Sequence, residues 1–197
     1  MKKIEWDSPA ELVAVAENPL PAVGEAGYIY ARDGKKLRNG VFMPRKTPRG
    51  TIVLMTGYSE FIEKYFETIG DLLARDYCVA VLEWRGHGLS EGNSKDPQRL
   101  HLRHFDQNVE DLEDRFDRLV RGVCPPPYFG LAHSMGGQIS LRAARKHPDW
   151  FTALAYSAPM FGLRLNRNII RTLRVTLPWL ALFSGSDNWS RFDPPTR

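Results

Sequence analysis

The most informative segment of this sequence is Leu131-Ala132-His133-Ser134-Met135-Gly136-Gly137-Gln138. The apolar residues 128–131 predict a short buried strand that runs into it, and residues 139–146 predict a helix that leaves it. A serine on a sharp strand-to-helix turn is the arrangement called a nucleophile elbow. Because the turn is tight, the positions two before and two after the serine must be small, as Ala132 and Gly136 are.

Two interpretations of this stretch compete. The pattern small-x-Ser-x-Gly arises often by chance, so an ordinary glycine-rich helix start is one of them. The position between a buried strand and a helix favours the other, in which Ser134 is a nucleophile raised above the sheet. The backbone N–H of Met135 would then point at a developing oxyanion, and His133 and Gly136 would line the same site.

Apolar runs alternate with helical patterns along most of the chain. Continuous apolar runs predict buried strands at 51–55, 78–82 and 151–156, and helical periodicity predicts helices at 61–75 and 105–120. The Asp33-Gly34 pair predicts a hairpin between strands at 28–31 and 37–42. This alternation indicates the α/β class, with a mostly parallel sheet and helices on both faces. The loops at 56–60, 83–92 and 132–137 would then meet beyond the carboxyl ends of the strands, where such sheets bind ligands.

Composition indicates a globular protein with one core. The 197 residues are 43% hydrophobic and 25% charged, with an extended arm expected at 1–25 and the core at 26–162. Cys78 and Cys124 lack CxxC spacing and indicate no disulfide framework. The N-terminus turns acidic where a signal peptide would turn apolar, and no apolar run approaches the roughly 20 residues of a membrane span. We therefore expect a soluble, cytoplasmic protein, and we expect no metal and no cofactor.

The net charge of +4 is concentrated near the C-terminus. Residues 160–197 hold two acidic residues, Asp187 and Asp193, and six arginines, which are Arg164, Arg167, Arg171, Arg174, Arg191 and Arg197. Nucleic acid is not an expected partner, because its binding needs a wider basic patch with interleaved aromatics. Four of the arginines would share one helical stripe. That stripe is either a solvated helix face or a basic surface for transient contact with anionic lipid head groups. The sequence makes no prediction of the oligomeric state.

A second loop complements the serine. Thr56-Gly57-Tyr58-Ser59-Glu60 follows the predicted strand 51–55, and Gly57 would let the backbone approach a substrate closely. The N–H of Tyr58 is then a candidate second oxyanion donor beside that of Met135. The alternative is a plain strand-to-helix turn capped by Ser59 or Glu60, and the two interpretations are compatible.

The histidines offer no convincing general base. His87 stands between glycines in the loop 84–92, which we interpret as a close-packed wall of the site rather than a phosphate cradle. His133 precedes the nucleophile and would point away from it, whereas His101 and His104 fall in a loop and at a helix start. His147 ends the predicted helix after Ser134, where a cationic side chain suits the helix dipole.

Taken in order, the motifs 57–60, 83–92 and 133–137 resemble the α/β-hydrolase superfamily, and within it the monoacylglycerol lipase and lysophospholipase L2 group of serine aminopeptidase-like hydrolases. The resemblance runs from about Tyr28 to Leu163. It implies Ser134 as nucleophile, Tyr58 and Met135 as oxyanion donors, and a helical cap that begins in residues 163–197. Thr56 and Ala132 depart from the pattern, because the family commonly has His and Gly there.

The resemblance also implies a triad in the order Ser, Asp, His, with the last two beyond the cap. Asp187 and Asp193 fit no strand end, so we expect an N-terminal portion of a longer hydrolase in which the 197-residue chain alone has little activity. The expected function is hydrolysis of a carboxylic ester such as a lysolipid, through an acyl-enzyme on Ser134, as part of lipid metabolism. The alternatives are a non-catalytic binding protein of the same fold, or a transacylase or peptidase on the same scaffold.

Overall fold

The computed structural model describes residues 3–14, 18–92, 102 and 104–162. Within these residues a seven-stranded sheet has the order β1-β2-β3-β5-β4-β6-β7. The strands are β1 (Ser8–Ala10), β2 (Gly24–Tyr30), β3 (Lys36–Phe42), β4 (Thr51–Met55), β5 (Cys78–Leu82), β6 (Tyr128–His133) and β7 (Ala153–Ser157). Strands β5, β4, β6 and β7 are parallel, whereas β1, β2 and β3 continue the sheet in antiparallel pairs. The fold is therefore of the expected α/β class.

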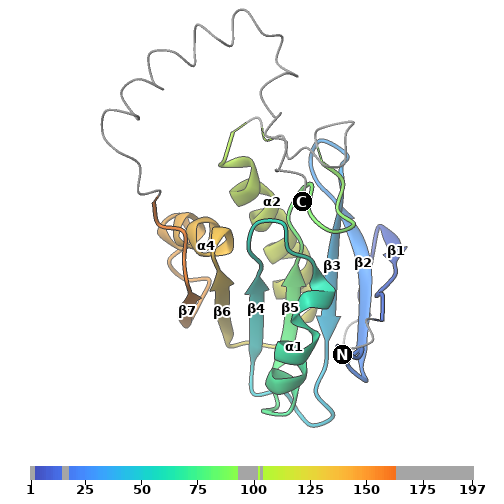
Figure 1. Ribbon diagram of the computed structural model, residues 1–197. Coiled ribbons are helices and arrows are strands. Elements are labelled where there is room, and N and C mark those ends of the chain that lie inside the picture. The colour runs from blue at the N-terminus through green and yellow to red at the C-terminus, as the bar shows by residue number, and fades with distance from the viewer. Residues whose placement is uncertain (1–2, 15–17, 93–101, 103, 163–197) are drawn as a thin grey trace, which may run out of the picture.

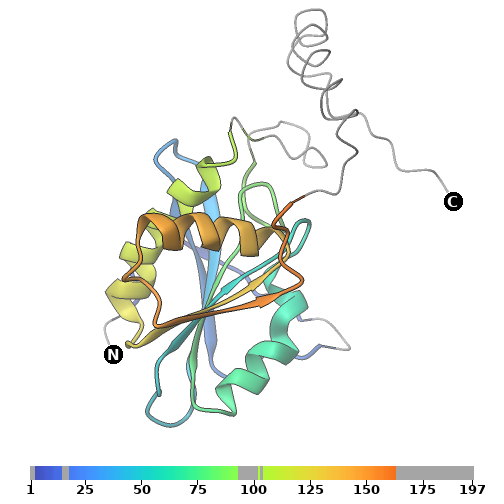
Figure 2. The same cartoon turned by 90° about the vertical axis from the view of Figure 1, so that its left-hand side faces the viewer.

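Helices cover both faces of the sheet (Figures 1 and 2). The 3₁₀ turn η1 (Ile62–Tyr65) and helix α1 (Phe66–Leu73) pack on one face. Helices α2 (Gln107–Arg115) and α4 (Met135–Lys146) pack on the other, and α2 continues through the π-helical turn η2 (Phe116–Val120) into α3 (Arg121–Val123). No helix in the described part of the chain is long and apolar enough to cross a membrane.

Strand β5 lies inside the sheet and has no exposed residue, which is why it reads as a continuous apolar run. Val79 and Val81 face α1, whereas Ala80 and Leu82 belong to the core beneath α2 and α4. The central strands are thus packed between an apolar cluster on each face of the sheet. Since β4, β5 and β6 run parallel, the loops that follow them emerge at one edge of the sheet.

The N-terminal region differs in part from the expected extended arm. Residues 8–10 form β1, which pairs with β2 in register Ser8↔Tyr28, and β2 begins at Gly24 rather than at Tyr28. The hairpin at Asp33-Gly34 is present, with Gly34 at φ 79° between β2 and β3. The division into an arm, a core at 26–162 and a cap at 163–197 stays a prediction, and the last segment lies outside the described residues.

Candidate active site

Ser134 occupies a strained turn between β6 and α4. Its φ of 48° and ψ of −114° lie in a region that L-residues rarely adopt, at a typical cost of about 1–3 kcal/mol. Three backbone hydrogen bonds hold the turn: Ser134 N–H donates to the Ser157 carbonyl at 3.1 Å, and the Ser134 carbonyl accepts from Gly137 at 3.0 Å and Met160 at 2.9 Å. The surrounding backbone thus stabilises a conformation that raises the half-buried Ser134 out of the strand.

The two small positions around Ser134 are tightly packed. A Cβ atom on Gly136 would lie 2.3 Å from the carbonyl oxygen of Met55 and 2.6 Å from that of Thr56. Ala132 is fully buried. The start of α4 therefore lies against the end of β4, and only glycine fits at position 136.

Two backbone N–H groups, one after β4 and one after β6, lack an acceptor among the described residues. Met135 begins α4, so its N–H has no acceptor within the helix. Tyr58 follows β4, and its N–H has no acceptor among the residues that the structure describes. Tyr58 is 57% exposed, and its ring contacts the His87 ring edge-on, with 5.4 Å between the centroids.

Glu60, which the sequence suggested only as a cap, fixes the loop that carries Tyr58. Its carboxylate accepts hydrogen bonds from Gly57 N–H, from the Tyr65 hydroxyl and from Lys64. Burial raises the pKa of Glu60, but these hydrogen bonds, chiefly those from Lys64 and Tyr65, outweigh burial and lower the pKa below its ordinary value. The charged Glu60 therefore fixes the Tyr58 loop through its hydrogen bond with the N–H of Gly57.

A buried ionic network connects the loop 83–92 with the segment that carries Tyr58. Arg38 binds Glu63 at 2.8 Å and Glu83 at 2.7 Å, and all three side chains are almost fully buried. Glu83 also accepts from the backbone N–H groups of Leu89, Ser90 and Ile62. One carboxylate thus connects the loop 83–92 to the turn that follows the Tyr58 loop.

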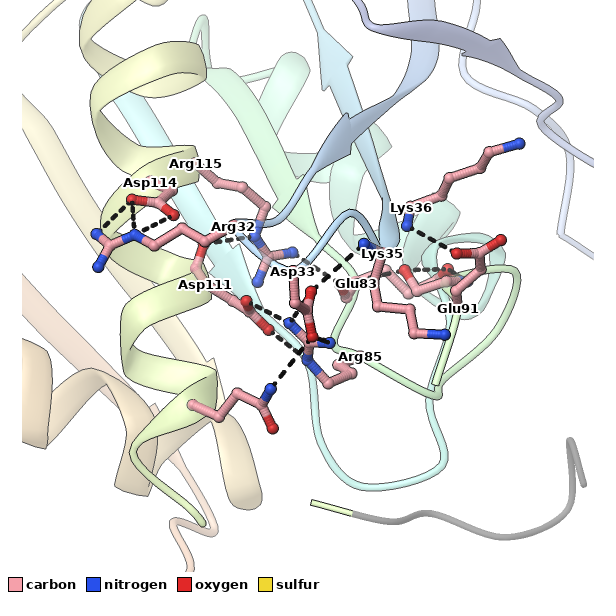
Figure 3. A network of polar contacts seen from close by, with 12 residues as sticks. Arg32, Asp33, Lys35, Lys36, Glu83, Arg85, Glu91, Asp111, Asp114 and Arg115 are labelled. Atoms are coloured by element: carbon pink, nitrogen blue, oxygen red, sulfur yellow. Dashed lines mark hydrogen bonds and ion pairs between the residues drawn. The ribbon is translucent and has the colours of Figure 1, made fainter. Parts of the chain in front are cut away.

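The loop 83–92 continues this network toward α2 (Figure 3). Arg85 binds Asp111 and Asp33, both at 2.8 Å, and so connects the loop 83–92 to α2 and to the β2–β3 hairpin. Arg115 donates to the Glu83 carbonyl at 2.7 Å. These contacts show that the described part of the loop is closely packed, whereas its role as a wall of the site stays a prediction.

None of the described histidines hydrogen-bonds the Ser134 hydroxyl. The buried His87 bonds the Arg85 carbonyl through Nδ1 at 2.9 Å, and burial lowers its pKa. His133 bonds the Ser157 carbonyl through Nδ1 at 3.0 Å, and His147 pairs with Glu113 at the end of α4. In the part of the chain that the structure describes, the Ser134 hydroxyl has no hydrogen-bond partner. His101, Asp187, Asp193 and the arginine stripe lie outside the described residues.

Thr56, one of the two departures from the family pattern, is buried at the end of β4. Its carbonyl accepts a hydrogen bond from Trp84 Nε1 at 2.7 Å, whereas its hydroxyl has no partner among the described residues. A cavity of about 490 Å³ opens beside the elbow on the α1 side, between Lys64, Leu131, His133 and Ser157. The described residues contain no cluster of three or more His, Cys, Asp or Glu side chains suited to a metal.

Together, the sheet order and the strained serine between β6 and α4 define an α/β hydrolase. A family model described as serine aminopeptidase, S33, matches residues 46–190. The chain belongs to this family.

Known proteins agree with this assignment. The chain is 36% identical over 115 residues to lysophospholipase L2 of Escherichia coli strain K12, covering 57% of this chain and 33% of that protein. It is 32% identical over 126 residues to monoacylglycerol lipase of Mycolicibacterium smegmatis, covering 64% of this chain and 43% of the relative. The chain thus spans well under half the length of these two relatives.

Solved structures share the fold. A thermostable carboxyl esterase from Bacillus coagulans superposes with a TM-score of 0.66 at 19% identity, over 85% of this chain and 53% of the esterase. Monoacylglycerol lipase of Paleococcus ferrophilus superposes with a TM-score of 0.56 at 22% identity, over 71% of this chain and 50% of that enzyme.

Proposed function

We propose that Ser134 is the nucleophile of a carboxylic-ester hydrolase. The observation that carries the proposal is the positive φ of Ser134 at the β6–α4 junction, held by three backbone hydrogen bonds and by the contact of Gly136 with β4. Backbone strain of this kind persists only where the surroundings maintain it, and it is concentrated at functional sites.

In the proposed reaction, Ser134 Oγ attacks the ester carbonyl carbon and gives up its proton to a general base. The carbonyl oxygen becomes an oxyanion that accepts hydrogen bonds from the N–H groups of Tyr58 and Met135. Collapse of this intermediate expels the alcohol, which takes the proton, and leaves an acyl group on Ser134. Water attacks the acyl-enzyme and releases the acid, which restores the serine.

The base that this mechanism needs is proposed to lie outside the described residues. None of the described histidines hydrogen-bonds the Ser134 hydroxyl: His133 and His87 contact backbone carbonyls, and His147 pairs with Glu113 at the far end of α4. We therefore expect the described residues to supply the nucleophile and the oxyanion donors, while another segment supplies the base.

The substrate class is proposed to be a lipid ester of the lysophospholipid or monoacylglycerol kind. The names of the relatives from E. coli and M. smegmatis support it. The exposed Tyr58 ring would offer an apolar wall beside the oxyanion donors. Contact with a membrane surface through the arginine stripe, and a cytoplasmic location, also stay proposals.

The test compares the protein produced from its own gene with a Ser134→Ala variant, on a monoacylglycerol, a lysophospholipid and an aminoacyl amide. Loss of the nucleophile in a serine hydrolase lowers turnover by a factor on the order of 10⁶, so we expect ester hydrolysis to fall to background. Ser157→Ala is the matched control, because Ser157 is near the elbow and contributes only backbone contacts there. Ester hydrolysis that survives in Ser134→Ala would contradict the proposal, and turnover of the amide alone would favour a peptidase.

A further inference from the structure

The N-terminal segment, defined here as residues 11–14 together with Asn18, runs from the edge of the sheet to the turn beside the Tyr58 loop. It follows β1, which lies at the edge of the sheet and pairs with β2 (Figure 1). Leu12 packs against the apolar cluster that contains Ile62 of η1. The segment precedes residue 46, where the match to the family model begins, so the family assignment does not account for these contacts.

Glu63 in η1 is the residue that this segment binds. The Glu63 carboxylate accepts a hydrogen bond from Val13 N–H at 3.1 Å, and the Glu63 carbonyl accepts one from Asn18 Nδ2 at 2.7 Å. Arg38 binds the same carboxylate through two nitrogens, both at 2.8 Å, and also donates to the Glu11 carbonyl at 3.1 Å. The segment therefore binds both members of the Arg38–Glu63 ion pair, through three hydrogen bonds.

Glu63 needs these partners because it is both buried and charged. Only 3% of the residue is exposed. Burial raises the pKa of Glu63, but hydrogen bonds from Arg38 and then from Val13 N–H lower the pKa by more, so the carboxylate is ionised at neutral pH. A buried charge that loses a hydrogen-bond partner is costly to keep in place. Val13 is 51% exposed, so its backbone rather than its side chain is the part that serves Glu63.

A displacement of Glu63 would reach the Tyr58 loop over a short length of chain. Glu63 comes three residues after Glu60, whose carboxylate fixes that loop. Directly before Glu63, Ile62 N–H donates to Glu83 at 3.2 Å. The loop is thus fixed from within by Glu60 and at its C-terminal end by Glu63 and Glu83.

We propose that the N-terminal segment positions the backbone N–H of Tyr58 for oxyanion binding by holding Glu63 in place. This inference rests on the proposed function, in which that N–H is an oxyanion donor. Such a donor acts on charge that develops in the transition state, so its displacement should lower kcat and leave KM nearly unchanged. Outright loss of one donor lowers kcat by about 10²–10³-fold, and a displaced donor should cost less, about 10-fold.

Two variants remove the contacts to Glu63 independently. Val13→Pro removes the N–H that the carboxylate accepts, and Asn18→Ala removes the amide that binds the carbonyl. Val13→Ala is the matched control, because it truncates the exposed side chain and keeps the N–H. In the protein produced from its own gene we expect kcat toward a monoacylglycerol to fall about 10-fold in both test variants and to stay at the wild-type value in Val13→Ala.

Hydrogen exchange measured by mass spectrometry tests the same role without activity. The N–H groups of Gly57 and Ile62 are hydrogen-bonded at the two ends of the Tyr58 loop. We expect peptides that span 57–62 to exchange faster in both test variants than in the wild type, and peptides of β6 to exchange at the wild-type rate. A wild type that hydrolyses no ester would refute the proposed function, and the exchange comparison would still decide the role of the segment.

Four results would overturn the proposal. The first is wild-type exchange and turnover in Val13→Pro and Asn18→Ala. The second is faster exchange in β6 as well as in 57–62, because the segment would then stabilise the fold as a whole. The third is an equal loss of kcat in Val13→Ala, which would assign the effect to the side chain, and the fourth is a higher KM at constant kcat, which would assign it to substrate binding.

Discussion

The contact between α4 and β4 at Gly136 gives the most specific prediction of this structure. In Gly136→Ala the added methyl group would lie 2.3 Å from the Met55 carbonyl oxygen and 2.6 Å from that of Thr56. Both neighbours are backbone atoms of the strand end, so no side-chain rotation relieves the overlap. To regain an ordinary contact of 3.4 Å, the elbow and β4 must separate by about 1 Å.

The magnitude follows from two opposing effects. Overpacking of this kind destabilises by about 1–3 kcal/mol, whereas replacing a helical glycine by alanine stabilises by roughly 0.5–1 kcal/mol. Gly70→Ala is the matched control, because Gly70 lies in α1 and a Cβ there would contact nothing within 4 Å. We expect Gly70→Ala to be slightly more stable than the wild type and Gly136→Ala to be less stable than Gly70→Ala by about 1–3 kcal/mol, because the helical gain is common to both variants.

The assay is urea unfolding followed by tryptophan fluorescence, with the free energy of unfolding extrapolated to water. Ester hydrolysis by the protein produced from its own gene should also fall in Gly136→Ala, by about 10²-fold for a 1 Å displacement of the nucleophile. If Gly136→Ala and Gly70→Ala unfold within about 0.5 kcal/mol of each other, the packing argument for the elbow is wrong.

Three further predictions concern the supports of the site and the sheet edge. Arg38→Met leaves the buried carboxylates of Glu63 and Glu83 without their cation, so it should lower the free energy of unfolding by about 3–5 kcal/mol in urea titrations. The control Asp149→Asn changes an exposed side chain and should alter this free energy by less than about 0.5 kcal/mol. Equal effects of the two substitutions would contradict a supporting role of the buried network. The lowered pKa of Glu60 means that its charge stabilises the fold above the unfolded pKa of 4.5 and that this contribution disappears as pH falls through the lower folded value. Glu60→Gln should therefore destabilise the protein at pH 7 and do so less below pH 4.5 in the same titration, and a pH-independent effect would refute the assignment. Within the described residues β7 pairs only with β6, so its other edge offers unpaired backbone groups to a second chain. We therefore expect the 197-residue chain to self-associate in sedimentation velocity, and we expect Ala155→Lys, at an exposed position of β7, to reduce this association. A monomeric wild-type chain would contradict the prediction.

The central architecture could be predicted because its signals are local. The strands β4 and β5 are continuous apolar runs with bounds that match the structure, and the serine turn is a spacing of small residues. Strand β1 was not predicted, because three residues with a proline carry no periodic pattern and form a strand only by pairing with β2. The π-helical turn at 116–120 was not predicted either, because the apolar spacing of residues 105–120 is that of a regular α-helix.

The supports of the site could not be predicted for the same physical reason. Arg38, Glu63 and Glu83 come from three separate elements, and nothing in their local sequence marks them as partners. Glu60 had one local signal: it lies three residues after Gly57, the spacing at which a glutamate reaches back to a backbone N–H at a helix start. The fold converts these separate charges into one support for the Tyr58 loop.

The role of Ser134 as nucleophile can be tested by covalent labelling of the protein produced from its own gene with a fluorophosphonate, followed by peptide mass spectrometry. A fluorophosphonate reacts with a serine hydroxyl activated by a base and an oxyanion site, which are the features proposed at Ser134. We expect one adduct, on Ser134, and complete loss of labelling and of ester hydrolysis in Ser134→Ala. An active hydrolase that carries the label on another serine would contradict it.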